Sequence, residues 1–236
     1  MTPLSKDGGG DVVIIPRSYK SNKLKKISKK FCKIKIFHYL CPLQYYINMK
    51  LATHNSMTYL SPKKWYLYPF RFIARCQSKP IHEQYEKYGI RMFDIRISYD
   101  DKDNIEFRHG LIAYKGDVEG TLKYLNSRPE RVYIRLILEV GQYADLDKQE
   151  SLFKRDCKRF EKSYTNIRFF CGRRKFDWKK VYNFKYKDPT IIQKVSSTHG
   201  SKIDDLWPWL YAKLNNKKSL REEYKGWLFL DFIEIQ

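Results

Sequence analysis

Two histidines stand near the ends of short β-rich segments, where a strand would deliver them to a loop. His54 and His109 flank Asp94 and Arg96, which are two residues apart in one apolar run and therefore share a strand face. One imidazole can take a proton from an attacking oxygen while the other protonates a leaving alkoxide. An arginine offsets charge on phosphoryl oxygens and a carboxylate orients a ring. A single histidine in such a place is more often structural, but this combination predicts phosphodiester cleavage.

The elements that must position these residues follow one another in a βα pattern after residue 48. The predicted strands are Asn48–Thr53, Ile90–Ile97, Asn104–Arg108, Arg131–Glu139, Ile167–Cys171, Ile191–Ser196 and Gly226–Ile233. The predicted helices are Pro80–Tyr88, Asp117–Asn126, Leu146–Lys162, Trp178–Phe184 and Asp204–Leu214.

The fold class that this alternation predicts is α/β, a compact TIM-type (β/α)8 barrel. Val132–Leu138 is almost continuously apolar, as expected of a strand covered on both faces. Such barrels use about 250 residues. Because residues 48–236 are fewer, an element can be missing, and Val12–Ile15 is a candidate for it. The carboxyl ends of barrel strands carry the active site, which is where both histidines are expected.

Composition sets limits on the partners. Of 236 residues 42% are hydrophobic, which excludes wholesale disorder, and the formal net charge of +21 favours phosphate-bearing partners such as a diester substrate, an anionic phospholipid surface or nucleic acid. No helix-turn-helix, zinc-finger or RRM signature is present, which disfavours nucleic acid. The five cysteines, Cys32, Cys41, Cys76, Cys157 and Cys171, form no CxxC pair, so reduced thiols are expected.

No apolar run approaches the roughly 20 residues of a membrane-spanning helix. Met1–Pro16 lacks the basic and then apolar pattern of a secretory signal. A soluble or peripheral membrane protein is expected.

Five segments together resemble the X region of phosphatidylinositol-specific phospholipase C and the wider superfamily of phospholipase-C-like phosphodiesterases, most closely the bacterial type. They are Ala52–Thr58, with Ala-Thr-His-Asn-Ser, Ile81–Arg96, Phe107–Gly110, Glu119–Val132 and Gly226–Ile233. Their order and spacing match that family, whereas residues 140–225 match only loosely.

The resemblance implies a role for each matching residue. His54 corresponds to the general base and Asp231 to the carboxylate that orients it. His109 corresponds to the general acid, which Asp94 supports. Arg96 stands where calcium-dependent members have a carboxylate, so its fixed charge is expected to replace the ion and no cofactor is expected.

Two residues depart from the bacterial pattern. Asn55 replaces an aspartate, and Glu139 stands where calcium-dependent members keep a glutamate. As an alternative, Asn55, Asp94 and Glu139 would supply oxygen ligands for calcium. We expect instead that Glu139 pairs with Arg96 or another base.

Candidates for substrate binding are Asn55, Glu139, Arg173 and Arg174, the last two in a basic loop after a strand. His199 lies in a Gly/Ser loop. It is a candidate for a third residue at the barrel mouth, and a role in a turn is about equally expected. The predicted function is that of a phosphoric diester hydrolase. The alternatives are a non-catalytic protein that binds phosphate or lipid headgroups on the same barrel, and a nucleic-acid-binding protein.

Residues 1–47 are expected to be a basic extension, and residues 48–236 the barrel. Lys20–Lys35 combines eight lysines with apolar residues at helical spacing. Three interpretations stay open: a helix on anionic lipid, a helix packed on the barrel, and an upstream extension that ends before Met49. Trp65, Tyr66 and Tyr68 form an aromatic loop that suits a membrane surface, although exposed aromatics are also common without one.

Overall fold

The computed structural model describes residues 50–140, 144–173, 194–195, 207–221 and 226–235. The chain divides into two units, residues 1–48 and 49–236. The first unit, with the predictions for Val12–Ile15 and Lys20–Lys35, lies outside the described residues, as does the predicted helix Trp178–Phe184.

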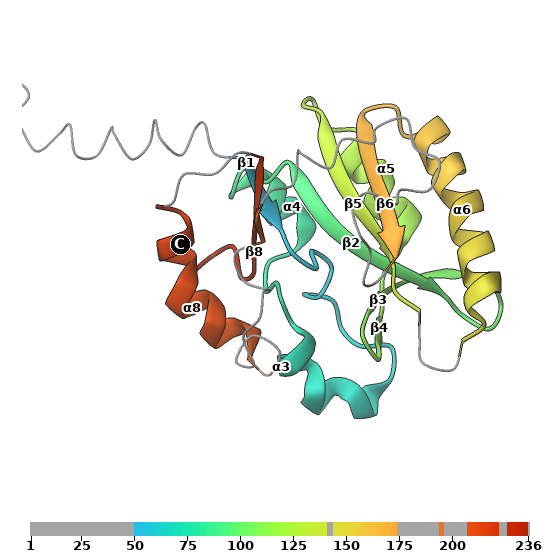
Figure 1. Cartoon of the computed structure of the whole chain (residues 1–236), viewed down its shortest axis with the longest axis horizontal. Coiled ribbons are helices and arrows are strands. Elements are labelled where there is room, and N and C mark those ends of the chain that lie inside the picture. Colours follow the sequence, from blue (N-terminus) through green and yellow to red (C-terminus); the bar gives the residue numbers. More distant parts are fainter. Residues whose placement is uncertain (1–49, 141–143, 174–193, 196–206, 222–225, 236) are drawn as a thin grey trace, which may run out of the picture. The chain divides into compact units, whose positions relative to one another are not determined.

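The strands form one eight-stranded sheet that curls into a partial barrel (Figure 1). Six strands are parallel neighbours in the order β7-β8-β1-β2-β5-β6, and β3 and β4 form a hairpin beside β2. Their bounds are β1 Lys50–Thr53, β2 Met92–Tyr99, β3 Ile105–His109, β4 Ile112–Tyr114, β5 Val132–Leu138, β6 Ile167–Arg173, β7 Lys194–Val195 and β8 Trp227–Leu230. The predicted fold class is confirmed.

The strand predicted at Asn104–Arg108 is present as β3, but it does not belong to a parallel βα unit. It pairs antiparallel with the end of β2, with Ile97 opposite Phe107, and continues into β4, which the sequence did not predict. A tight turn joins β2 to β3, in which Asp100 donates its N–H to the carbonyl of Asn104 at 3.0 Å. A turn this short permits only an antiparallel return.

Four of the helices match predicted ones within a few residues. They are α4 Ile81–Glu86, α5 Val118–Asn126, α6 Leu146–Ser163 and α8 Pro208–Ser219. Asp145 begins α6, because its side chain accepts the N–H groups of Asp147 and Lys148 at 3.0 and 3.1 Å. The aromatic segment predicted as a loop instead forms the 3-10 helix η1, Trp65–Phe70, followed by the short helix α3, Arg71–Ala74.

The two-residue period of the strands gives the sheet two different faces. On β2, Phe93, Ile95 and Ile97 pack into the main core with the helices, while Met92, Asp94 and Arg96 face the other way. This second, inner face has an apolar floor made by Ala52, Met92, Phe170, Trp227 and Phe229. Two positions further along β1, β2 and β8 stand His54, Asp94 and Asp231, so the floor supports a polar layer at the carboxyl ends.

The helix α3 lies at the end of the sheet toward which the arrow of β6 points (Figure 1). That is the carboxyl end of the parallel strands, where the loops of barrel proteins carry their active sites. Cys76, Cys157 and Cys171 are buried and unbridged, as predicted. No helix in the described ranges is long and apolar enough to cross a membrane.

Candidate active site

The three side chains at the carboxyl end with the clearest chemistry share a backbone feature. Each is followed by a residue whose φ lies in the left-handed region: Asn55 (45°) after His54, Gly110 (57°) after His109 and Phe232 (46°) after Asp231. Glycine and asparagine tolerate this conformation, but a buried phenylalanine adopts it only where the surrounding structure holds it. Phe232 is fixed by its N–H, which donates to the Cys76 carbonyl at 2.6 Å. The turns direct all three side chains toward one cavity.

The contacts of His54 fix the position of its ring proton. Its Nδ1 lies 2.7 Å from Asp231 Oδ1, and its Nε2 lies 2.7 Å from Arg96 Nη2 and 3.2 Å from Asn55 Nδ2. Arginine and the amide nitrogen can only donate, so Nε2 must carry the lone pair and Nδ1 the hydrogen. This is the tautomer that a general base needs, with Asp231 as the group that orients it.

His109 has the same tautomer through a different partner. Its Nδ1 donates to the carbonyl oxygen of Ala74 at 2.8 Å, and its Nε2 accepts from Asn55 Nδ2 at 3.2 Å. The amide of Asn55 therefore stands between the Nε2 atoms of the two imidazoles. Both rings direct their reactive nitrogen at the same small volume.

Arg96 is held by two carboxylates. Its Nη1 donates to Glu139 Oε2 at 3.0 Å, as predicted, and its Nε lies 3.4 Å from Asp94 Oδ2. Burial alone would lower the pKa of Arg96, but the two carboxylates raise it above its usual value. Burial works to raise the pKa of Asp94, yet Arg135, 3.4 Å from its Oδ1, and Arg96 lower it to about 2. The site is therefore a cluster in which arginine side chains alternate with carboxylates.

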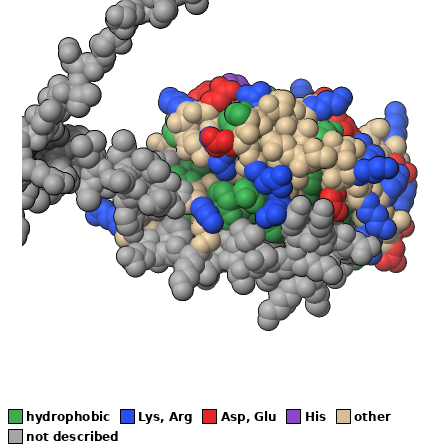
Figure 2. Space-filling view, turned by 90° about the horizontal axis from the view of Figure 1, so that it is seen from above, with side chains coloured by type: hydrophobic (Ala, Val, Ile, Leu, Met, Phe, Trp, Pro, Cys, Tyr) green, Lys and Arg blue, Asp and Glu red, His purple; other side chains and the backbone are tan. Residues whose placement is uncertain are grey.

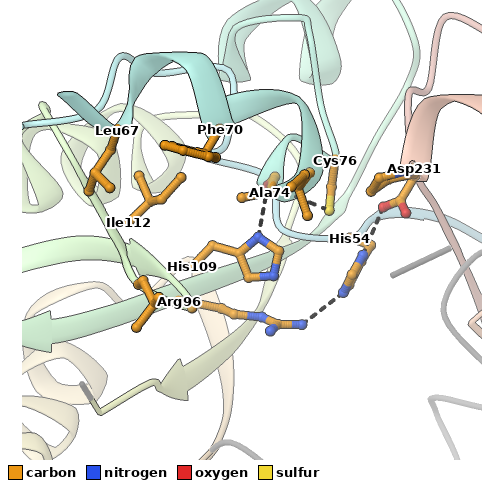
Figure 3. Close-up of a pocket in the computed structure, with 13 residues that line it drawn as sticks. His54, Leu67, Phe70, Ala74, Cys76, Arg96, His109, Ile112 and Asp231 are labelled. Atoms are coloured by element: carbon orange, nitrogen blue, oxygen red, sulfur yellow. Dashed lines mark hydrogen bonds and ion pairs between the residues drawn. The ribbon is translucent and has the colours of Figure 1, made fainter. Parts of the chain in front are cut away.

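These residues open into a cavity of about 690 Å³. Leu67, Phe70, Ile73, Leu111 and Ile112 form an apolar wall on one side. Figure 3 shows His54, Arg96, His109 and Asp231 at the same cavity, which Phe70 of η1 and Ala74 of α3 also line. The volume is in the range of sites that hold small organic ligands.

The structure brings together seven of the predicted site residues: His54, Asn55, Asp94, Arg96, His109, Glu139 and Asp231. Arg174, His199 and the side chain of Arg173 lie outside the described residues. One predicted pairing differs. No hydrogen bond or ion pair joins Asp94 to His109 in the described chain. Asp94 instead accepts the N–H of Asn55 at 3.1 Å and lies 3.7 Å from His54 Nε2, because β2 places it beside β1.

Sequence reasoning missed Arg135 and Gln77. Arg135 lies on β5 four positions before Glu139, which directly follows that strand, so the period of two would have placed both on the inner face. No residue spacing in the sequence indicates a role for Gln77. Its Nε2 donates to the carbonyls of His54 and Leu230 at 3.0 and 2.8 Å, which ties the ends of β1 and β8 together.

The proposed calcium ligands do not fit that ion. Both oxygens of Glu139 are already used, by Arg96 and by the N–H of Gly110 at 2.6 Å, and Asp94 lies between Arg96 and Arg135. Calcium requires six to eight oxygen atoms. A guanidinium in their midst would repel it, so no calcium-dependent step is derived.

The environment of His109 predicts a pH-dependent stability. Burial and the charge of Arg96 lower its pKa from 6.5 to about 4. Between these values the unfolded chain binds a proton that the folded chain does not, so acid favours unfolding there. The free energy of unfolding should fall by at most about 3 kcal/mol from this group as the pH drops from 7 to 4.

Chemical denaturation of the full chain at several pH values checks this dependence. The difference in unfolding free energy between the wild type and His109→Gln should change across that window and stay constant above it. A difference independent of pH would contradict the lowered pKa.

Comparison with solved structures shows a fold shared with bacterial phosphatidylinositol-specific phospholipase C. The protein from Listeria monocytogenes aligns with a TM-score of 0.51 at 16% identity, over 78% of this chain and 88% of that one. A single-site mutant of the Staphylococcus aureus protein aligns with a TM-score of 0.50 at 13% identity, over 78% and 85%. A double mutant gives 0.51 at 14%, with the same coverage. No family model and no curated protein matches this chain.

Proposed function

We propose that this protein is a phosphoric diester hydrolase that uses His54 as general base and His109 as general acid. The observation that carries the proposal is the pair of Nε2 lone pairs, each 3.2 Å from the same Asn55 amide nitrogen. Two imidazoles on opposite sides of one point suit a reaction in which one proton is removed and another is delivered. The fold shared with phosphatidylinositol-specific phospholipases C supports this class.

In the first step His54 Nε2 accepts the proton of the attacking hydroxyl. In the free protein Arg96 Nη2 occupies this lone pair at 2.7 Å. A bound phosphodiester would compete for the guanidinium, because two phosphate oxygens match its donor fork better than one ring nitrogen does. Substrate binding would thereby release the base, while Asp231 stabilises the imidazolium that forms.

In the same step His109 delivers a proton to the leaving oxygen. Its pKa of about 4 makes it neutral near pH 7 in the free protein. The anionic substrate works in the opposite direction to Arg96 and raises the pKa of this imidazole, so that it binds the proton which it later donates. If the substrate offers a hydroxyl beside the diester, as inositol does, a cyclic phosphate is the first product and water then opens it.

A panel of diesters tests the proposal. The full chain is incubated with phosphatidylinositol vesicles and with soluble inositol, glycerol and nucleoside phosphodiesters, each with and without EDTA. Headgroup release is expected in both conditions, because Arg96 supplies the positive charge. Loss of activity in EDTA with recovery on calcium would contradict the role of Arg96. No release from any diester would contradict the proposed class.

The entrance of the cavity carries exposed aromatic side chains, which we propose to contact a lipid surface. Trp65 is 85% exposed, and Tyr66, Tyr68, Phe70 and Phe72 are between 51% and 58% exposed. All belong to η1 and α3, and Phe70 also lines the cavity. A patch of this kind marks an interaction site.

Replacing Trp65 and Tyr66 by alanine should weaken binding to vesicles by at least about tenfold, since burying even one large aromatic contributes about 1.5–3 kcal/mol. Hydrolysis of a soluble diester should be unchanged. Vesicle sedimentation measures the binding, and Leu146→Ala, an exposed apolar residue on α6, is the control. Equal binding of the double variant and the wild type would contradict this role.

The nucleic-acid alternative finds less support on the described surface. At the α6 end of the molecule, Figure 2 shows Lys and Arg side chains interspersed with Asp and Glu. Lys148 lies 2.7 Å from Asp103 and Arg159 lies 2.6 Å from Glu119. A nucleic-acid footprint is a continuous basic stripe, whereas these charges are neutralised locally.

A further inference from the structure

One group of side chains in the active-site cavity has the composition of a metal site. A ring nitrogen of His54, Sγ of Cys76 and a carboxylate oxygen of Asp231 all lie within 4.8 Å of one another, and Nδ1 is the nitrogen that faces Asp231. His54 and Asp231 belong to the proposed reaction, but nothing in that reaction requires a thiol. The presence of Cys76 beside them therefore calls for a separate explanation.

The three donors suit a thiophilic divalent cation. Zinc binds imidazole nitrogen, thiolate sulfur and carboxylate oxygen in tetrahedral sites, in which neighbouring donors stand about 3.5 Å apart. The 2.7 Å separation of His54 Nδ1 and Asp231 Oδ1 would widen, and donors further apart would close by about 1 Å. Such shifts lie within the reach of side-chain rotation.

Two further observations point to a ligand. Asp231 is 1% exposed, yet its Oδ2 has no hydrogen-bond partner in the described structure. A buried carboxylate oxygen without a partner is unfavourable, and a cation would satisfy it. Cys76 and His54 also line the cavity, which provides an entry path and a place for a fourth ligand.

We propose that zinc or a similar thiophilic metal ion binds His54, Cys76 and Asp231 and inhibits the protein. The inhibition, though not the binding, rests on the proposed function. On binding, the Cys76 thiol releases its proton, and the neutral imidazole coordinates through Nδ1, so that its own proton moves to Nε2. The lone pair of the base is then lost.

The shift of the His54 proton from Nδ1 to Nε2 would also disrupt the contact between His54 and Arg96. Nε2 of His54 would become a donor 2.7 Å from Arg96 Nη2, which is also a donor. The guanidinium would have to move away, and the fork expected to hold the substrate phosphate would move with it. One metal ion would thus disable both the base and the phosphate site.

A cadmium titration of the full chain tests the site without reference to activity. Cadmium should produce a thiolate charge-transfer band at one equivalent, with release of about one proton from the thiol. The band should persist in Cys32→Ser/Cys41→Ser and disappear in Cys76→Ser and in Cys76→Ala. Circular dichroism establishes that both Cys76 variants are folded. A band retained in a folded Cys76 variant would overturn the site.

Inhibition is then measured with zinc on the best substrate of the diester panel. With each protein's rate expressed relative to its own zinc-free rate, Cys76→Ser should raise the half-inhibitory zinc concentration at least about tenfold, because even lost outer-shell contacts weaken metal sites by that factor. Magnesium and calcium at the same concentrations should not inhibit, since neither prefers thiolate. Equal zinc inhibition of the wild type and Cys76→Ser would overturn the proposal. If no diester is hydrolysed, the cadmium band still shows whether the metal site is present.

Discussion

Replacing His109 by leucine should lower the hydrolysis of a diester with an alkoxide leaving group by about 10²–10⁴-fold. An alkoxide is a strong base and departs only when it receives a proton. A nitrophenolate departs without one, so a nitrophenyl diester should lose less than about tenfold in the same variant. The quantity to measure is the ratio of kcat/KM for the two substrates, which concentration errors and partial unfolding do not change.

His82→Leu is the matched control, because His82 is an exposed histidine on α4. It should leave both substrates unaffected. Equal losses for the alkoxide and nitrophenolate substrates in His109→Leu would remove the acid role and leave His109 as a binding or structural residue. His54→Gln should affect both substrates alike, since the attacking hydroxyl must lose its proton whatever group departs.

Much of the sheet could be predicted from the sequence, because its strands are short apolar runs with a two-residue period. β1, β5 and β8 lie within the predicted segments, and β2 and β6 each extend two residues past the predicted end. The hairpin of β3 and β4 was not foreseen as antiparallel, since the apolar pattern of Asn104–Arg108 is the same for either direction. The direction of the strand depends on the length of the connecting turn. The spacing of apolar residues carries no information about that length.

The site was predictable to the extent that its residues belong to strand ends. His54 pairs with Asp231, as the family resemblance implied, and Arg96 pairs with Glu139, as we expected from the residue types. The partner of His109 was not predictable, because it is the backbone carbonyl of Ala74, which any residue type provides. The place of Cys76 beside His54 and Asp231 was also not predicted, since a lone cysteine between α3 and α4 carries no spacing signal.

Arg96→Lys is the most informative test of how the site replaces a metal ion. Lysine keeps one positive charge near Glu139 and Asp94, so these buried carboxylates stay partly neutralised and the fold should persist. Removing the charge altogether would take away the cation that both buried carboxylates contact, at a cost of about 3–5 kcal/mol, which would confuse catalysis with unfolding. The ammonium cannot bridge two phosphate oxygens as a planar guanidinium does.

The charge that develops on the phosphoryl oxygens in the transition state would therefore lose one fixed donor, and kcat should fall by about 10²–10³-fold with a much smaller change in KM. Arg128→Lys is the control, because Arg128 is also paired with a glutamate, Glu86, at 3.3 Å but does not line the cavity. Its kcat should match the wild type. A rise in KM at constant kcat in Arg96→Lys would mean that Arg96 binds the ground state and transition state equally, and its charge would then contribute to affinity rather than to rate.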